Sequence, residues 1–235
     1  MKPRLVVDAD AAVAAAVLIA RAVDAALAER NRATLALSGG RMAPPLYSAL
    51  ADATVDWSRV IIVQTDERIV APADVDRNWR AFLASPLGRR VPRANLRPMP
   101  VDAAADGSAY ARTLRAVAGD PPVLDVVHLG LGSDGHTASL FAGDAALAEE
   151  REPVCLTASH QGHRRMTLTL PTLRRARLRL WLVCGAPKRY ALARLLAGDA
   201  AAVATRALAG DSVVVADAAA AADVLSAAVQ DRTAG

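Results

Sequence analysis

The sequence predicts an α/β fold in which helices cover both faces of a mainly parallel sheet. Two observations support this prediction. Short apolar runs typical of strands alternate with longer stretches typical of helices along the chain. Glycine-rich or polar turns follow three of the predicted strands, at the carboxyl ends where open α/β sheets bind ligands.

Taken in order, the elements begin with an alanine-rich helix over residues 8–29, because alanine has the strongest intrinsic preference for helix. Further helical stretches are 44–53, one that begins near Asn78, 107–118, 137–141, 188–196 and 218–229. The apolar runs that predict strands are 34–37, 60–64, 123–129, 154–158, 166–170, 178–184 and 212–216. The sequence shows no internal repeat.

Length and composition favour a single domain over residues 1–235, because no linker-like segment or change of composition divides the chain. A chain that is 53% apolar can bury a sizeable core. We expect no window able to span a bilayer, since Arg21 and Asp24 soon follow the apolar residues 11–20. The N-terminus carries Asp8 and Asp10 and lacks a secretory pattern, so we expect a cytoplasmic protein with no membrane partner.

The net charge of +4 comes mainly from arginine, since Lys2 and Lys188 are the only lysines. The arginines are spread along the chain without interleaved aromatic residues, which argues against nucleic-acid binding. An anionic small substrate suits this charge. Cys155 and Cys184 lie in apolar, strand-like runs without C-x-x-C spacing, so we interpret them as buried thiols.

The turn after residues 123–129 carries an acid and an imidazole, Asp134 and His136, separated by one glycine. Residues 130–135 also match the dinucleotide-binding pattern G-x-G-x-x-G. Asp134 argues against that hypothesis, because its carboxylate would lie beside the pyrophosphate. The glutamates within 149–152 also precede the next predicted strand, whereas the ribose-binding acid should end it.

A second turn, Ser38, Gly39, Gly40 and Arg41, joins a predicted strand to a predicted helix. Paired glycines let backbone amides approach an anion closely, and the helix N-terminus adds further N–H groups and a favourable dipole. A proline at 44 or 45 suits the first helical turn. The alternative is an ordinary tight turn that binds nothing.

A third strand ends in Asp66, Glu67 and Arg68, with Asn78 shortly downstream at a helix start. Burying such charges at a strand end costs free energy unless they form ion pairs or bind a ligand. The alternative to a binding site is an Asp66–Arg68 ion pair with Asn78 as an N-cap.

Isolated basic and histidine residues carry weaker signals. Arg165 begins an alternating strand, and Lys188 is notable because the chain otherwise avoids lysine. His128 lies inside a predicted strand, which favours a core or edge histidine over a ligand. His160 and His163 lie in a polar loop without a third ligand, so we expect no metal site.

Together these segments resemble the 6-phosphogluconolactonase family, within the glucosamine/galactosamine-6-phosphate isomerase superfamily. The matching segments, in the family's order, are LSGG at 37–40, TDERIV at 65–70 with Asn78, LGLGSDGHTASLF at 129–141, RMTLTLP at 165–171 and GAPK at 185–188. The resemblance implies a modified Rossmann-like sheet, similar to that of glucosamine-6-phosphate deaminases and ribose-5-phosphate isomerases.

Two places favour a lactonase over a deaminase. Deaminases carry an Ala-Phe-Asn-Glu continuation where this chain has residues 136–141, and a tyrosine where it has Arg68. Two departures from the family pattern are also present. Arg41 and Met42 replace the usual Ser after the glycines, and Ala71 precedes the proline that often follows the valine directly.

The resemblance implies hydrolysis of 6-phosphoglucono-δ-lactone to 6-phosphogluconate in the oxidative pentose phosphate pathway. His136 is the implied general base, and Asp134 orients it or holds substrate hydroxyls. The implied substrate- and phosphate-binding residues are Ser38, Gly39, Gly40, Arg41, Asp66, Arg68, Asn78, Arg165 and Lys188. The scheme requires no cofactor or metal.

Two alternatives remain at this point, a glucosamine-6-phosphate deaminase or related isomerase and a non-catalytic sugar-phosphate sensor domain. The sequence lacks an obvious helix-turn-helix segment, which argues against the sensor. We expect the partner to be a phosphorylated sugar lactone and the protein to be a monomer or weak homo-oligomer.

Overall fold

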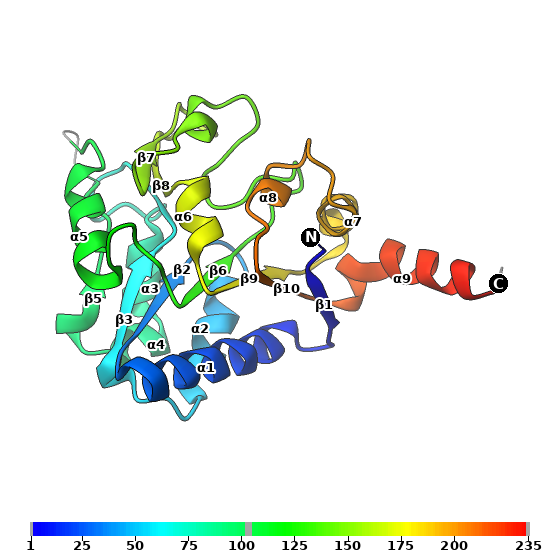
Figure 1. Ribbon diagram of the computed structural model, residues 1–235, viewed down its shortest axis with the longest axis horizontal. Helices are drawn as coiled ribbons and strands as arrows, with labels where there is room; N and C mark the ends of the chain where they lie inside the picture. The colour runs from blue at the N-terminus through cyan, green and yellow to red at the C-terminus, as the bar shows by residue number, and fades with distance from the viewer. Residues whose placement is uncertain (1, 102–104, 234–235) are drawn as a thin grey trace.

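A parallel sheet of seven strands forms the centre of the computed structural model, which describes residues 2–101 and 105–233 (Figure 1). The strand order is β1-β10-β9-β6-β2-β3-β5, with parallel pairing throughout. The strands are β1 (Arg4–Val7), β2 (Ala33–Leu37), β3 (Val60–Gln64), β5 (Leu96–Arg97), β6 (Val126–Leu129), β9 (Leu178–Val183) and β10 (Asp211–Ala216). The predicted fold class is confirmed.

Three short strands of the described chain form a separate antiparallel sheet in the order β4-β8-β7. They are β4 (Asp66–Arg68), β7 (Val154–Leu156) and β8 (Arg165–Leu168). The sequence analysis placed residues 66–68 at the end of a predicted strand, whereas they form a strand of their own, and it did not separate β7 and β8 from the main sheet. Met166 and Leu168 of β8 share a buried cluster with Val127 of β6, so the small sheet packs on one face of the large one.

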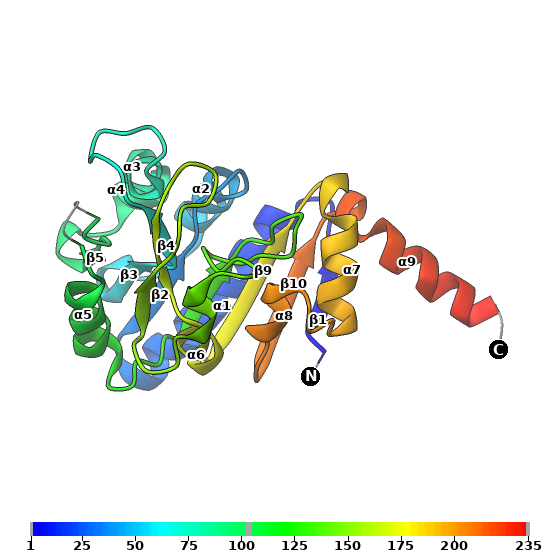
Figure 2. The same cartoon turned by 90° about the horizontal axis from the view of Figure 1, so that it is seen from above.

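Helices cover both faces of the large sheet, as predicted (Figures 1 and 2). Successive strand residues face opposite sides, so Ile62 of β3 joins one buried cluster while Ile61 and Val63 join the other. The Ile62 face is covered by α1 (Ala11–Arg30), α2 (Ala43–Asp52), α3 (Asn78–Ala84) and α4 (Pro86–Arg90). The opposite face is covered by α5 (Ser108–Ala118), α6 (Leu170–Arg175), α7 (Arg189–Ala197), α8 (Val203–Arg206), the start of α9 (Ala218–Thr233) and the small sheet.

The first helix corrects the expectation about membrane-spanning windows. By length and composition, α1 is the one helix of the described residues that could cross a membrane, with a mean hydropathy of 1.9. The two charges, Arg21 and Asp24, are too few to exclude such a span. Half of the window is buried, and Ile19 and Val23 are fully buried against the sheet. Its apolar residues therefore also serve as core.

One predicted helix, over residues 137–141, does not form. Thr137 and Leu140 instead make an isolated antiparallel bridge, and the Leu140 N–H donates to the Thr137 carbonyl at 3.0 Å. Thr137 Oγ1 donates to the Gly130 carbonyl, and Ser139 Oγ donates to Asp66 Oδ2 at 2.6 Å. These side-chain bonds to other segments compete with helix formation.

The bounds of two further strands also differ from the predicted ones. The strand predicted over 166–170 ends at Leu168, because Thr169 is the N-cap of α6 and Pro171 occupies its first turn. The strand predicted over 123–129 begins only at Val126. The sequence prediction missed β1, β5 and the short helices α4, α6 and α8.

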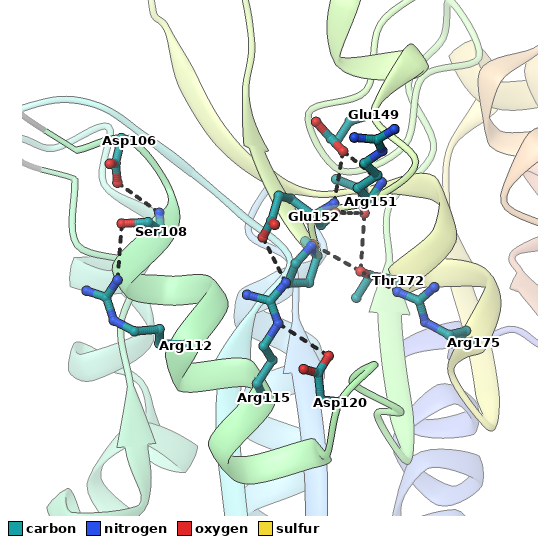
Figure 3. A network of polar contacts seen from close by, with 12 residues as sticks. Asp106, Ser108, Arg112, Arg115, Asp120, Glu149, Arg151, Glu152, Thr172 and Arg175 are labelled. Carbon is teal, nitrogen blue, oxygen red and sulfur yellow. Dashed lines mark hydrogen bonds and ion pairs between the residues drawn. The ribbon is translucent and has the colours of Figure 1, made fainter.

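Surface ion pairs join α5 to the segment that leads into β7 (Figure 3). Arg115 Nη2 donates to Glu152 Oε2 at 2.9 Å, and Arg115 Nε lies 3.3 Å from Asp120 Oδ1. Glu149 Oε1 accepts the backbone N–H groups of Arg151 and Glu152. These contacts account for two of the glutamates that the dinucleotide hypothesis considered.

Candidate active site

A cavity of about 430 Å³ opens at the carboxyl ends of β2, β6 and β9. This is the edge at which open α/β sheets bind ligands. All the predicted site residues except Asp134 line it, namely Ser38, Gly39, Gly40, Arg41, Asp66, Arg68, Asn78, His136, Arg165 and Lys188. The fold therefore brings together turns that lie far apart in the sequence.

Asp134 lies behind His136 and holds its ring. His136 Nδ1 is 2.6 Å from Asp134 Oδ1, and the His136 backbone N–H donates to the same oxygen at 3.1 Å. Because a carboxylate only accepts, we assign the ring proton to Nδ1, which leaves the Nε2 lone pair available. His136 lines the cavity, so this ring can accept a proton from a molecule bound there.

The same contacts keep Asp134 ionised. Partial burial would raise the pKa of Asp134, but the hydrogen bond from the His136 amide and the electrostatic interaction with the His136 ring lower it below its ordinary value. The carboxylate therefore remains an acceptor for Nδ1 at neutral pH.

The loop that carries this pair requires glycine at 132. A Cβ there would lie 2.1 Å from His136 Nδ1 and 2.3 Å from Asp134 Oδ1. The Gly132 N–H donates to the His136 carbonyl at 2.8 Å, and Gly135 has a φ of 88°. The glycines that match the dinucleotide pattern therefore fold the acid against the imidazole, and no helix follows them.

The Gly39-Gly40 turn has the features of an anion site. In the residues that the structure describes, the backbone N–H groups of Gly39, Gly40 and Arg41 donate to no protein acceptor. They precede the N-terminus of α2, which has proline in its first turn as predicted. Ser38 Oγ lies 2.6 Å from Thr65 Oγ1 and donates to the His128 carbonyl, so this hydroxyl secures the turn.

The alternative reading of the third motif, an Asp66–Arg68 ion pair with Asn78 as N-cap, is wrong. Asp66 Oδ2 accepts from Ser139 Oγ, and Arg68 Nη1 donates to the Asp76 carbonyl at 2.5 Å. Asn78 is the first residue of α3, and its Nδ2 donates to the Asp66 carbonyl at 3.3 Å.

Glu67 is fully buried and anchors this part of the site. Its Oε1 accepts the backbone N–H groups of Arg68 and Asn78, both at 2.9 Å. Its Oε2 accepts the Trp79 N–H at 2.8 Å and Gln64 Nε2 at 2.9 Å. A carboxylate is favourable at the N-terminus of α3, so Glu67 fixes both Arg68 and Asn78 without lining the cavity.

Arg68 and Arg165 are direct partners across β4 and β8. Like charges opposite each other destabilise an antiparallel pair. Arg165 is only 5% exposed, and among the described residues its Nε has no hydrogen-bond partner. Burial lowers the pKa of Arg165, Asp66 raises it, and Arg68 lowers it. An anion in the cavity would supply the partner that this cation lacks.

Lys188 adds a second cationic position. Burial lowers the pKa of Lys188, as does the charge of Arg41, whereas Asp134 raises it. Asp217, which the sequence analysis missed, accepts the Gly185 N–H at 2.9 Å and the Ala220 N–H at 2.7 Å. It thus secures the turn before Lys188, and an aspartate before an alanine-rich helix was the available signal.

His128 and Cys184 also line the cavity, although the sequence analysis treated both as core residues. His128 is 2% exposed, and its Nδ1 accepts the Ser38 N–H at 3.4 Å. Burial lowers the pKa of His128 to about 4, so the ring is neutral at neutral pH. Burial raises the pKa of Cys184 to about 11, so the group is a thiol. Both cysteines are free, but they are half-buried, whereas the sequence analysis expected buried thiols.

The remaining histidines pair with single carboxylates. His160 Nε2 lies 2.8 Å from Asp144 Oδ2, and His163 Nε2 lies 3.1 Å from Asp76 Oδ2. In residues 2–101 and 105–233 no group of three His, Cys, Asp or Glu side chains could hold a metal ion.

A doubly covered parallel sheet, an Asp–His pair and four basic side chains at one cavity define a class of α/β enzyme that acts on small anions. The chain belongs to the family described as glucosamine-6-phosphate isomerases/6-phosphogluconolactonase, whose sequence profile matches residues 7–215. The resemblance seen in the sequence motifs is confirmed.

Individual relatives agree with this assignment. The chain is 38% identical to the 6-phosphogluconolactonase of Synechocystis sp. over 194 residues. The matched region covers 79% of this chain and 80% of the relative. The solved 6-phosphogluconolactonase of Trypanosoma brucei has a TM-score of 0.84 at 26% identity, covering 95% of this chain and 99% of that one. A monomeric glucosamine-6-phosphate deaminase shares the fold, with a TM-score of 0.78 at 18% identity, over 94% of this chain and 99% of that one.

Proposed function

We propose that this protein hydrolyses 6-phosphoglucono-δ-lactone to 6-phosphogluconate, in the oxidative pentose phosphate pathway. The observation that carries the proposal is the Asp134–His136 pair beside a cavity that four basic side chains line. Lactone hydrolysis needs a base for water and positive charge for the oxyanion. Relatives named 6-phosphogluconolactonase support the substrate.

In the proposed reaction, His136 Nε2 takes a proton from water as the water oxygen bonds to the lactone carbonyl carbon. The carbonyl oxygen becomes an oxyanion on a tetrahedral carbon. When the bond between that carbon and the ring oxygen breaks, the proton on Nε2 passes to the leaving oxygen. The new carboxylic acid then ionises, which gives the open-chain carboxylate and one released proton.

The basic residues have two tasks in this scheme, because the substrate carries a phosphate and develops an oxyanion. Arg68, Arg165 and Lys188 are the candidates for both, since charge-assisted hydrogen bonds to such oxygens are strong. The amides of Gly39, Gly40 and Arg41, in the turn that Ser38 secures, and the Arg41 guanidinium complete the proposed phosphate site. Asp66 and Asn78 line the same cavity and complete the proposed substrate-binding set.

An assay on freshly generated lactone, corrected for spontaneous hydrolysis, tests the proposal. We expect the wild-type protein to accelerate hydrolysis and to release no ammonia from glucosamine 6-phosphate. His136→Ala should lose about 10²-fold or more in turnover, the contribution of a general base, and still bind 6-phosphogluconate. Ammonia release without lactonase activity would instead identify a deaminase, and binding without turnover would identify a sensor.

The proposal takes residues 1–235 as one domain, which the continuous seven-stranded sheet of the described residues supports. It places the protein in the cytoplasm, and the free thiols of Cys155 and Cys184 support a reducing compartment. It takes the protein to be a monomer or weak homo-oligomer, which sedimentation velocity would measure directly.

A further inference from the structure

The Phe141 ring contacts two groups that the proposed reaction uses. Its centroid lies 4.4 Å from that of the His136 ring, with 38° between the planes. Arg165 Cζ lies over the Phe141 ring, 5.2 Å from its centroid. The proposed base and the most buried of the proposed substrate-binding cations thus share one aromatic neighbour.

A histidine and a buried carboxylate support Phe141 in turn. His160 stacks on Phe141 with the centroids 4.1 Å apart and 19° between the planes. His160 Nε2 bonds to Asp144 Oδ2, whose side chain is 1% exposed. Asp144 also accepts the backbone N–H groups of Ala146 and Ala158, so its own position is fixed. The order of contact is Asp144, His160, Phe141 and then His136.

We propose that Phe141, supported by His160 and Asp144, is a positioning residue that fixes the ring plane of His136 and the guanidinium of Arg165 relative to each other. The inference rests on the lactonase function proposed above. It also explains why His160 is paired with a buried carboxylate.

The two contacts of His136 restrain different motions. Asp134 holds one ring nitrogen and sets the direction of Nε2, while contact with Phe141 restrains tilting of the ring plane. Small displacements of a catalytic group lower reaction rates strongly, because the reacting atoms must lie within a narrow geometry. An aliphatic side chain of similar volume would fill the space without offering a flat face.

Arg165 depends on Phe141 in a different way. The face of an aromatic ring is electronegative and attracts a guanidinium, most strongly where water is excluded. The Nη2 contacts of Arg165 to the His160 carbonyl and to Gln161 Oε1 are both long, at 3.4 Å. The ring face therefore contributes to holding a cation that has few close partners.

Phe141→Leu tests the inference, because it retains an apolar side chain and removes the ring. We expect kcat for lactone hydrolysis to fall about tenfold and the Kd for 6-phosphogluconate, measured by calorimetry, to rise about fivefold. In an Arg165→Met background, Phe141→Leu should leave this Kd within about twofold, because the cation that the ring holds is gone. Ile19→Val, a buried substitution in α1, is the control for lost packing and should change neither quantity.

His160→Gln gives an independent test if Phe141→Leu does not fold, since it removes the stacked ring and keeps an amide that can donate to Asp144. We expect about a threefold loss of kcat. The inference is overturned if the folded variants keep wild-type kcat and Kd, or if Phe141→Leu weakens binding equally with and without Arg165. Wild-type protein without lactonase turnover would refute the proposed function itself, which is a distinct result.

Discussion

At the scale of single residues, chemistry at this site depends on side chains whose partners are incomplete. His136 has one ring nitrogen occupied by Asp134 and lines the cavity, and Arg165 is a buried cation with an unpaired Nε among the described residues. In a structural ion pair such as Arg115 with Glu152, by contrast, the two charges are paired with each other and do not line the cavity. This difference separates the candidate active-site residues from the other charged residues.

Asp134→Asn tests the orientation of the base. The amide can donate to Nδ1, which would place the ring proton on Nε2 and remove the lone pair that accepts from water. We expect kcat to fall about 10²-fold, the lower range of a general-base contribution, with KM little changed. Steady-state kinetics measure both, and a kcat close to that of the wild type would remove Asp134 from this role.

Arg165→Met and Lys188→Met test which cations bind the phosphate. Loss of a charge-assisted hydrogen bond made equally in substrate and transition state should raise KM about tenfold and leave kcat unchanged. Arg89→Met, at an exposed position in α4, is the control. A lowered kcat with unchanged KM would assign that residue to the oxyanion instead.

At the scale of elements, the site is built where strands end and the chain turns. The β2–α2 turn contributes amides, the loop after β6 contributes the Asp–His pair, and β4 and β8 contribute the paired arginines. Two positions need glycine because a side chain from another part of the site lies close to the backbone there. A Cβ on Gly39 would lie 2.1 Å from Asn78 Oδ1, and a Cβ on Gly132 would collide with His136. The elements therefore depend on one another at the site.

Glu67→Gln tests the anchor of α3. The neutral amide presents one acceptor oxygen and one NH₂ group to four donors, so buried N–H groups lose their partners. We expect the free energy of unfolding to fall by about 2 kcal/mol, measured by urea denaturation. Glu150→Gln, at an exposed position in the same chain, should change it little. Equal stability of the two variants would contradict the anchoring role.

At the scale of the whole molecule, stability comes from two buried clusters on opposite faces of one sheet. His128 of β6 lines the cavity, is buried and has no charged partner, and burial lowers its pKa from 6.5 to about 4. Below the unfolded pKa the unfolded chain binds a proton that the folded protein does not. Stability contributed by this group is therefore complete above pH 6.5 and is lost as the pH falls toward about 4.

Urea denaturation at pH 7 and pH 5 tests this linkage. For the wild-type protein, His128 should lower the free energy of unfolding by about 2 kcal/mol between these values, an order-of-magnitude figure. In His128→Leu that contribution is absent, so the loss over the same interval should be smaller by about that amount. Identical losses in the two proteins would show that His128 does not drive the pH dependence.

The sequence by itself determined the parallel α/β fold, the family and ten of the residues that line the cavity, because apolar periodicity and short turn motifs are local properties of the chain. Only the tertiary structure decided which charged residues line the cavity and which ones hold other segments in place. Asp66 bonds to Ser139, Glu67 anchors α3, residues 137–141 form a turn, and Phe141 and His160 lie beside the proposed base. These contacts join segments distant in sequence, and their energies depend on burial and neighbouring partners, which local pattern does not specify.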